Sequence, residues 1–407
     1  MIDRFTKAAL LLVGVTGLPA MGADVTVSLV GGGVELTDAP VFLAIEDAGV
    51  QPGSYSLKPV EADGEALTAQ VVRVGDALAM AMVIPSLGAE ETIQYSMSPS
   101  STSAEGVSIT AEGEDLRVEI DGELFTIYRA ADGPKPYFFP VIGPTGTPIT
   151  RAYPMEDVEG EDRDHPHQRS FWFTHGNVDG VDFWASDPLN RPNPKFGTIA
   201  EIDRPGVVEG PVAGVIETIN AWKGPEGQVL CTDHRVWRTY DLDGVRVIDF
   251  DVTIAAGDSP VTFEDTKEGT FGLRLATSMN VNKKMGGRIV NAEGVVDTDA
   301  WGKASPWVDY TGPIGDETLG VAILNHPSSF RFPTTWHVRD YGLFAANPFG
   351  YRDFKYADSG THTIAPGESI AFRYRVILHR GDTEAAQIAG AFEAYAHPPK
   401  VTISTTE

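Results

Sequence analysis

The sequence has almost no cysteine, and no long apolar run follows its first residues. Cys231 is the only cysteine among 407 residues, so the chain can form no internal disulfide. Beyond residue 23 no stretch approaches the roughly 18 apolar residues of a membrane-spanning helix, so we expect no membrane insertion. A chain of this length can be stabilised by buried apolar cores, and it is long enough for two domains.

Basic residues are also scarce. The sequence has 31 Lys and Arg against 57 Asp and Glu, which gives a formal net charge of −26. This surplus of negative charge repels phosphate backbones and anionic lipid surfaces, so we expect no nucleic-acid partner. It also disfavours polyanionic substrates, unless Arg and Lys gather locally at the binding site.

The short motifs of several large enzyme classes are missing. The sequence has no Gly-x-Ser-x-Gly elbow, no phosphate-binding glycine loop, no dinucleotide fingerprint, no His-Glu-x-x-His helix and no Cys-x-x-Cys pair. The triplet Gly31-Gly32-Gly33 lies in a β-rich region and opens no helix, so it is not a nucleotide loop. The sequence therefore assigns no cofactor.

Residues 1–23 have the pattern of a cleavable signal peptide. Arg4 and Lys7 precede the short apolar run 8–18, and small residues follow it up to Ala23. This pattern predicts a soluble protein exported to the periplasm of a bacterium or secreted from it. The sequence does not indicate an oligomeric state.

Many alternating segments and few helical ones predict an all-β protein. About six short apolar runs within 24–104 predict an N-terminal immunoglobulin-like sandwich domain, followed by a polar linker. Residues 107–399 contain long alternating strands and the hairpin signals Asp121-Gly122 and Asp243-Gly244. They predict a second domain, a large antiparallel β-supersandwich of two sheets packed face to face. A short C-terminal helix is expected within 382–397.

Segment 161–184 concentrates side chains that could do chemistry. Read as an extended strand, it places His165, His167, Arg169 and His175 on one face. His165 and His167 would then lie close enough to contact one substrate or one ion. If a metal is bound, these two residues are its candidate ligands, although we favour a catalytic role for them. The alternative is a surface loop, rich in Asp and His, that runs into a core strand.

Two later segments carry further candidate site residues. In 264–275, Glu268 and Arg274 share one face of a predicted strand, which is either a cleft face or an ordinary charged surface. In 330–354, aromatic rings alternate with basic and amide side chains. Sugar sites combine such groups, because pyranose faces stack on rings and hydroxyls need fixed donors and acceptors. The alternative for this segment is an aromatic core with a few loop charges.

Four motifs together resemble a bacterial family whose members are often labelled PmoA, or methane oxygenase PmoA. They are HPHQRSFWFTHGNVDGVDFW, EDTKEGTFGLRLA, WGKASPWVDYTG and WHVRDYGLFAANPFG, and the resemblance covers most of 135–380. A methane mono-oxygenase subunit is a membrane protein of several helices, whereas this chain has no such span. Family members commonly occur in bacteria that use polysaccharides, so the resemblance implies a role in polysaccharide degradation.

The C-terminal domain is also similar to the galactose-mutarotase supersandwich, which aldose epimerases share with parts of glycosidases and polysaccharide lyases. The segment PGESIAFRYRVILH, residues 366–379, resembles the closing strands of that fold. In aldose epimerases a His acts as the acid and a carboxylate as the base. The resemblance therefore implies His165 or His167 as acid and Glu268 as base.

The three site segments predict a carbohydrate-active protein whose partner is a saccharide. The first hypothesis is an enzyme, either a lyase, a hydrolase or an epimerase, that uses general acid/base chemistry. A non-catalytic glycan-binding protein is the second, and a metal-dependent oxidoreductase, as the PmoA label suggests, is the third. The candidate catalytic residues are His165, His167, Glu268 and His337. The candidate substrate-binding residues are Arg169, Trp172, His175, Arg274, Trp336, Arg339, Asn347 and Arg352.

Overall fold

A computed structural model describes residues 24–46, 49–61, 64–100 and 106–406 of the protein. The predicted signal peptide lies outside the described residues, as does most of the predicted linker, so both stay predictions. In the described part the protein is all-β with one short α-helix near the C-terminal end, as predicted. No helix in this part has the length and apolar character needed to cross a membrane.

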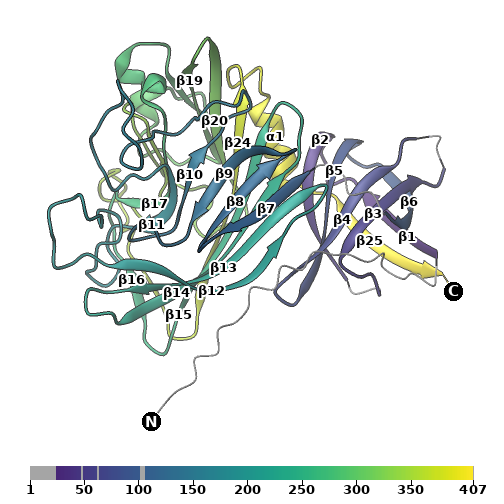
Figure 1. The fold of residues 1–407 in the computed structure, drawn as a ribbon, viewed down its shortest axis with the longest axis horizontal. Helices are drawn as coiled ribbons and strands as arrows, with labels where there is room; N and C mark the ends of the chain where they lie inside the picture. Colours follow the sequence, from purple (N-terminus) through teal and green to yellow (C-terminus); the bar gives the residue numbers. More distant parts are fainter. Residues whose placement is uncertain (1–23, 47–48, 62–63, 101–105, 407) are drawn as a thin grey trace.

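Seven antiparallel strands form the smaller of two β-sandwiches, drawn on the right of Figure 1. Their order is β2-β5-β4-β3-β6-β1-β25, and the sheet curls so that β2 comes close to β25. Buried side chains such as Val27, Tyr55 and Met80 fill the space inside. The strands are β1 (Asp24–Val30), β2 (Leu36–Ile45), β3 (Gly53–Pro59), β4 (Leu67–Val74), β5 (Ala77–Leu87), β6 (Thr92–Pro99) and β25 (Lys400–Thr406).

Two larger sheets of eight strands each form the second sandwich, on the left of Figure 1. The first, called sheet S here because it carries the candidate site, has the order β21-β22-β17-β11-β10-β9-β8-β7. Its strands are β7 (Val107–Glu112), β8 (Asp115–Ile120), β9 (Glu123–Arg129), β10 (Tyr137–Val141), β11 (Phe171–His175), β17 (Gly269–Arg274), β21 (Trp336–Val338) and β22 (Leu343–Ala346).

The second large sheet packs against sheet S, and its order is β12-β13-β14-β15-β24-β20-β19-β18. A separate two-stranded ribbon, β16-β23, lies beside the two sheets. The remaining strands are β12 (Thr198–Val208), β13 (Ala213–Lys223), β14 (Val229–Tyr240), β15 (Arg246–Ala256), β16 (Val261–Phe263), β18 (Arg288–Asn291), β19 (Trp307–Ile314), β20 (Glu317–Asn325), β23 (His362–Ile364) and β24 (Ser369–Arg380). The 3-10 helices are η1 (Thr277–Met279), η2 (Val281–Lys283) and η3 (Asp297–Ala300).

Aromatic side chains fill the space between the two large sheets. The ring of Phe271 in β17 stacks on Phe250 of β15 and on Tyr374 of β24, with centroid distances of 4.9 and 4.7 Å. Phe171 of β11 packs edge-on against Trp237 of β14 at 5.4 Å. Each such ring removes a large apolar area from water, so this layer is the main stabilising core of the sandwich.

The opposite face of sheet S carries a second, smaller apolar cluster. Because side chains alternate along a strand, Phe171 and Phe173 point into the main core while Trp172 points the other way. There it packs with Trp184, Tyr137 and neighbouring residues. The candidate site lies above this cluster, so sheet S serves as the rigid floor of the site.

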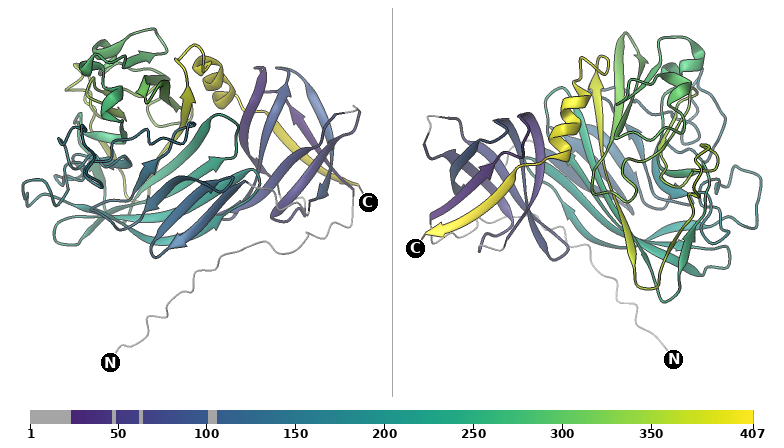
Figure 2. Two further views of the ribbon diagram at one scale, coloured as in Figure 1. Left: turned by 45° about the horizontal axis from the view of Figure 1, so that its top comes forward. Right: turned by 180° about the vertical axis from the view of Figure 1, so that it is seen from behind.

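The helix α1 (Ile388–Ala396) lies at the junction of the two sandwiches, as the right-hand view of Figure 2 shows. Its apolar side chains Ile388, Phe392 and Tyr395 are buried, in agreement with the predicted helix within 382–397. The junction is also hydrogen-bonded, because Gln70 Oε1 accepts from the backbone N–H groups of Val212 and Ala213, at 3.2 and 3.0 Å.

The extended strand that the sequence predicts through His165 and His167 is wrong in its first half. Strand β11 covers only Phe171–His175, and the residues before it form turns. His165 has a φ of 44° and Ser170 a φ of 54°, conformations that no regular strand contains. The two histidines therefore reach the site from a turn, above the sheet rather than within it.

Candidate functional site

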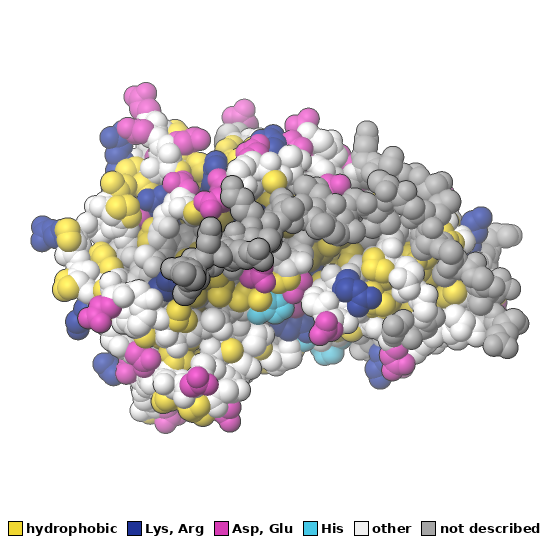
Figure 3. All heavy atoms as spheres, turned by 60° about the horizontal axis from the view of Figure 1, so that its bottom comes forward, with side chains coloured by type: hydrophobic (Ala, Val, Ile, Leu, Met, Phe, Trp, Pro, Cys, Tyr) yellow, Lys and Arg dark blue, Asp and Glu magenta, His cyan; other side chains and the backbone are white. Residues whose placement is uncertain are grey.

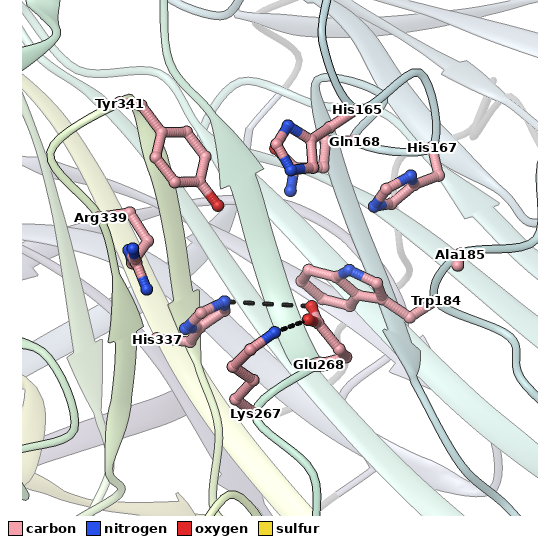
Figure 4. A pocket seen from close by; sticks show the side chains of 10 residues that line it. All are labelled: His165, His167, Gln168, Trp184, Ala185, Lys267, Glu268, His337, Arg339 and Tyr341. Carbon is pink, nitrogen blue, oxygen red and sulfur yellow. Dashed lines mark hydrogen bonds and ion pairs between the residues drawn. The ribbon is translucent and has the colours of Figure 1, made fainter. Parts of the chain in front are cut away.

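A cavity of about 390 Å³ opens above sheet S, where turns and strand ends from four parts of the chain converge. Figure 4 shows Tyr341, Arg339 and His337 on one side of it, with His167 and Trp184 on the other. The ten lining residues are His165, His167, Gln168, Trp184, Ala185, Lys267, Glu268, His337, Arg339 and Tyr341.

The turn that carries His165 and His167 is held by a buried arginine from an earlier loop. Arg151 is fully buried, and its guanidinium donates to Asp162 O at 3.2 Å and to His165 O at 3.1 Å. It also pairs with the Asp164 carboxylate at 2.6 Å. Arg274 of β17 pairs with the same Asp164 oxygen at 2.7 Å. Two guanidinium groups from separate segments therefore fix one carboxylate at the edge of the pocket.

His165 is oriented by that carboxylate and by an aromatic ring. Its Nδ1 lies 2.7 Å from Asp164 Oδ2, and its ring stacks on Tyr341 with a centroid distance of 5.4 Å and an interplanar angle of 6°. Burial raises the pKa of Asp164, but the hydrogen bond with His165 and the charge of Arg274 outweigh it and lower that pKa well below its usual range. The ionised carboxylate accepts the Nδ1–H, so the neutral form of this ring has its lone pair at Nε2.

His167 is fixed in the opposite tautomer. Asn190 Nδ2 donates to His167 Nδ1 at 3.0 Å, which leaves the proton of the neutral ring on Nε2. Burial, with the nearby charge of Lys135, lowers the pKa of His167 to about 3. The ring is therefore neutral near pH 7 and offers an N–H donor.

His337 on β21 has the same arrangement on the other side of the pocket. Trp301 Nε1 donates to His337 Nδ1 at 2.9 Å, so Nε2 carries the proton of the neutral ring. Its pKa is held well below the usual value by burial and by the charge of Lys267. His337 Nε2 lies 4.0 Å from Glu268 Oε2, in the arrangement that Figure 4 shows.

Glu268 is the only carboxylate among the described residues that line the cavity. It precedes β17, it is one-third exposed, and it forms an ion pair with its neighbour Lys267. Its carboxylate therefore lies between an ammonium group and the imidazole of His337. A ligand in the cavity would meet this charge pair on one side and the His165 ring on the other.

Five predicted site residues line the cavity, namely His165, His167, Glu268, His337 and Arg339. Arg274 lies directly behind them, because it donates to Gln168 and pairs with Asp164. It is buried and contacts the Tyr341 ring from 4.8 Å, so it supports the lining residues.

The other six predicted binding residues do not line the cavity, because five have side chains buried within the fold and the side chain of Arg352 is exposed elsewhere. Trp172 packs in the floor cluster, where its ring lies directly against Gly272 of β17. His175 is buried between Phe263 and Phe349 and bonds to Glu264 O at 2.8 Å. The remaining four have these partners: Arg169 pairs with Asp187, Trp336 donates to Ser305 O, Asn347 donates to Thr266 O, and the Arg352 backbone donates to Asp265.

Sequence reasoning did not select Gln168, Trp184, Ala185, Lys267 or Tyr341 as site residues. Two of them had a local signal, because Lys267 adjoins Glu268 and Tyr341 lies in the aromatic segment 330–354. Lys135 holds the segment of Trp184 and Ala185 at the cavity, because its buried ammonium donates to the carbonyls of Phe183, Trp184 and Ser186.

The donor set does not fit a metal centre. Among the described residues, no group of three or more His, Cys, Asp or Glu side chains is placed to hold a metal ion. The rings of His165 and His167 have centroids 5.7 Å apart and cross at 73°, and each Nδ1 already has a protein partner. A mononuclear protein site usually needs at least a third ligand, and none converges here.

The fold and the cavity together define an all-β protein of two sandwiches with a polar, histidine-rich pocket above one face of sheet S. Residues 115–393 match the model of the family of unknown function DUF6807. This match covers more than half of the chain, so the protein belongs to that family.

No curated protein matches this sequence. Among solved structures, the chain is similar to a glycosyl hydrolase family 38 protein from Enterococcus faecalis, with a TM-score of 0.42 and 11% identity over 95% of this chain and 47% of that one. An α-mannosidase from Enterococcus faecalis V583 gives a TM-score of 0.40 and 11% identity, over 95% and 46%.

A GH36 α-galactosidase from Geobacillus stearothermophilus gives a TM-score of 0.34 and 11% identity, over 68% of this chain and 40% of that one. The chain thus spans less than half the length of each of these three proteins. TM-scores this low do not bear on what the protein does.

Proposed function

We propose that this protein is a carbohydrate-active enzyme that moves a proton on a sugar by general acid/base chemistry, with the cavity above sheet S as its active site. The observation that carries the proposal is the pairing of Asp164 with His165, beside one imidazole N–H donor, His167, and across the cavity from a second, His337. A site with one proton acceptor and separate donors is suited to removing a proton and stabilising the charge that develops.

His165 is the proposed base. The Asp164 carboxylate holds its Nδ1–H and stabilises the imidazolium that forms when Nε2 takes a proton. Stacking on Tyr341 fixes the ring plane, so the lone pair points in a constant direction. This assignment differs from the aldose epimerase pattern, in which a carboxylate is the base, because Glu268 is here paired with Lys267.

His167 and His337 are the proposed donors. Both rings are neutral near pH 7, because burial lowers their pKa values, and each presents an Nε2–H. The N–H groups of these neutral rings, together with the Lys267 ammonium, can stabilise negative charge on a substrate oxygen by donating hydrogen bonds to it.

Proton abstraction fits the cavity better than hydrolysis by two carboxylates. Glycosidases of the common type need two carboxyl groups on either side of the scissile bond. Glu268 lines the cavity alone among the described residues, and Asp164 is occupied by Arg151, Arg274 and His165. A lyase or an epimerase therefore accounts for the side chains more completely than a hydrolase does.

The size and lining of the cavity also suit a sugar. At about 390 Å³ it lies near the lower end of small-molecule sites, which span roughly 300–1,000 Å³, so it suits one or two sugar rings. Tyr341 is partly exposed and offers an aromatic ring, whereas the almost fully buried Trp184 and Gln168 shape the wall of the cavity. We further propose that the protein acts after export, on sugars outside the cytoplasm.

The test is incubation of the purified protein with a panel of mono- and oligosaccharides in D₂O. We expect deuterium at one sugar carbon by NMR, or an unsaturated product by mass spectrometry. His165→Ala should lower kcat by roughly 10²–10⁴-fold. The matched control is His397→Ala, a half-exposed histidine outside the pocket, which should leave kcat unchanged.

Three outcomes would contradict the proposal. Fragments that together gain one water would mean hydrolysis. Tight binding of a glycan with no exchange and no product would mean a glycan-binding protein. Activity that a chelator abolishes would favour the metal-dependent oxidoreductase that the PmoA label suggests. It would also contradict the conclusion that the side chains of the cavity do not fit a metal centre.

A further inference from the structure

Arg339 is a cation at the pocket that has no acidic partner in the described part of the chain. Lys267 pairs with Glu268, and Arg274 pairs with Asp164. The guanidinium of Arg339 lies instead beside two aromatic rings, with its Cζ 5.6 Å from the ring centroid of Trp301 and 5.6 Å from that of Tyr341. Ring contacts use the face of a guanidinium, so its N–H donors stay available to a ligand.

The backbone at Arg339 is held in one conformation. Arg339 N donates to Leu343 O at 2.7 Å, and Gly342 N donates to Arg339 O at 3.1 Å, which closes the tight turn between β21 and β22. Gly342 has a φ of +90°, and a Cβ there would meet Asn280 Oδ1 at 2.4 Å. The backbone that carries Arg339 therefore needs little reorganisation when a ligand arrives.

Positive charge gathers behind the pocket as well. One oxygen of Asp164 accepts from both Arg151 and Arg274, so a single carboxylate faces two buried guanidinium groups. The protein as a whole carries a formal charge of −26, and Figure 3 shows acidic side chains scattered over one face without a single dominant patch. Against that background, a cationic pocket with an unpaired Arg is a local exception that favours an anionic ligand.

We propose that Arg339 binds the carboxylate of the substrate, and that the pocket takes acidic sugars, the uronates, in preference to neutral ones. This inference rests on the proposed function. The planar fork of a guanidinium matches a carboxylate in a bidentate pair, which is stronger than a bond to a neutral hydroxyl. The Tyr341 ring contacts both Arg339 and His165, so a small sugar bound at Arg339 lies within one cavity with the proposed base.

The experiment is calorimetric titration of the full chain with glucuronate and galacturonate, and with glucose and galactose as their neutral counterparts. We expect the wild type to bind a uronate at least about tenfold more tightly than the matching neutral sugar. Arg339→Ala should weaken uronate binding by roughly 10–100-fold and leave neutral-sugar binding within about twofold.

Two further variants sharpen the test. Arg339→Lys keeps the charge and loses the fork, so its uronate affinity should fall between those of the wild type and Arg339→Ala. It also serves as the test variant if Arg339→Ala does not fold. Arg380→Ala removes an exposed arginine that pairs with Glu317, and it should change neither affinity.

The outcomes separate this inference from the proposed function. Equal affinity for glucuronate and glucose, with turnover of a neutral sugar, would overturn the uronate inference and leave the proposed function standing. A preference for glucose 6-sulfate that Arg339→Ala abolishes, with no preference for glucuronate, would replace the carboxylate with a sulfate ester. No binding and no turnover with any sugar would overturn both.

Discussion

At the scale of single residues, the hydrogen bonds to ring nitrogens decide what each histidine can do. Asp164 holds a proton on Nδ1 of His165, whereas Asn190 and Trp301 each donate to the Nδ1 of a different ring, that of His167 or His337. Three identical side chains therefore present one acceptor and two donors to the same cavity. Residue type alone could not assign these roles, because Asp164 adjoins His165 but the partners of His167 and His337 lie 23 and 36 residues away in the sequence.

Trp301→Phe tests the positioning of His337. The substitution keeps the aromatic packing but removes the donor to Nδ1, so the ring can change tautomer and lose its Nε2–H donor part of the time. We expect kcat to fall about tenfold with little change in KM, and the pH–rate profile to change shape. The matched control is Trp307→Phe, a buried tryptophan of the structural cluster at the junction, which should leave kcat unchanged.

The lowered pKa of His167 predicts a dependence of stability on acid. In the unfolded chain this histidine binds a proton below about pH 6.5, whereas in the folded protein its pKa is about 3. Between these two values the unfolded state holds more protons, so stability falls as the pH decreases. The loss from this residue is about 2–3 kcal/mol between pH 6.5 and 4.5.

Urea unfolding at several pH values measures this effect. His167→Gln should make the free energy of unfolding less dependent on pH in this window than it is in the wild type, whatever its effect at pH 7. His397→Gln changes a half-exposed histidine and should leave the pH dependence as it is. The same slope for His167→Gln and the wild type would show that His167 titrates normally in the folded state.

At the scale of elements, the strands were more predictable than the turns. Period-two alternation predicts β14 and β15, and the hairpin signals Asp121-Gly122 and Asp243-Gly244 both lie in turns between adjacent strands. These features depend on neighbouring residues only. The turn before β11 has no such local signal, since Arg151 and Arg274 determine its shape from outside it.

Arg151→Ala is expected to disrupt that turn. The loss leaves the carbonyls of Asp162 and His165 without this donor, and Asp164 without one of its two guanidinium partners. Removing one partner of a largely buried ion pair costs about 3–5 kcal/mol, and we expect somewhat less here because Asp164 is 43% exposed.

The free energy of unfolding in urea measures that loss, and Arg163→Ala is the control within the same turn. Arg163 is 60% exposed and pairs with Asp157, which is 68% exposed, so its removal should change stability by less than about 0.5 kcal/mol. Equal effects of the two substitutions would mean that Arg151 does not hold the turn.

At the scale of the whole molecule, the sequence predicts two β-sandwiches, but it does not predict which strand completes the smaller one. Alternation and turn spacing predict two groups of strands in order along the chain. They do not predict that β25 returns to pair with β1 along its whole length. The sequence from Lys400 onwards has no feature that indicates which strand it pairs with. Long-range pairing depends on which strand edge is left open after the others have paired.

Deleting the chain from Lys400 onwards should selectively destabilise the smaller sandwich. The deletion leaves the edge of β1 unpaired and removes Val401 and Ile403, which pack against its core. We expect a loss of about 2–4 kcal/mol, since each partly buried side chain contributes about 1–2 kcal/mol and the strand pairing is lost as well.

Thermal unfolding followed by calorimetry would show an earlier transition for the smaller sandwich in the deleted chain. Substitution of Ser404 by Ala is the control, because this exposed position keeps the backbone pairing. If the deleted chain unfolds in a single transition like that of the wild type, β25 does not stabilise the smaller sandwich.

The position of β25 also has a consequence for the order in which the protein is made. A ribosome delivers β1 to β6 first, yet their sheet receives its last strand only after the whole larger sandwich has been synthesised. Until then the edge of β1 is an open row of backbone donors and acceptors that another chain could occupy. The first sandwich whose synthesis begins is therefore the last whose strands are all available.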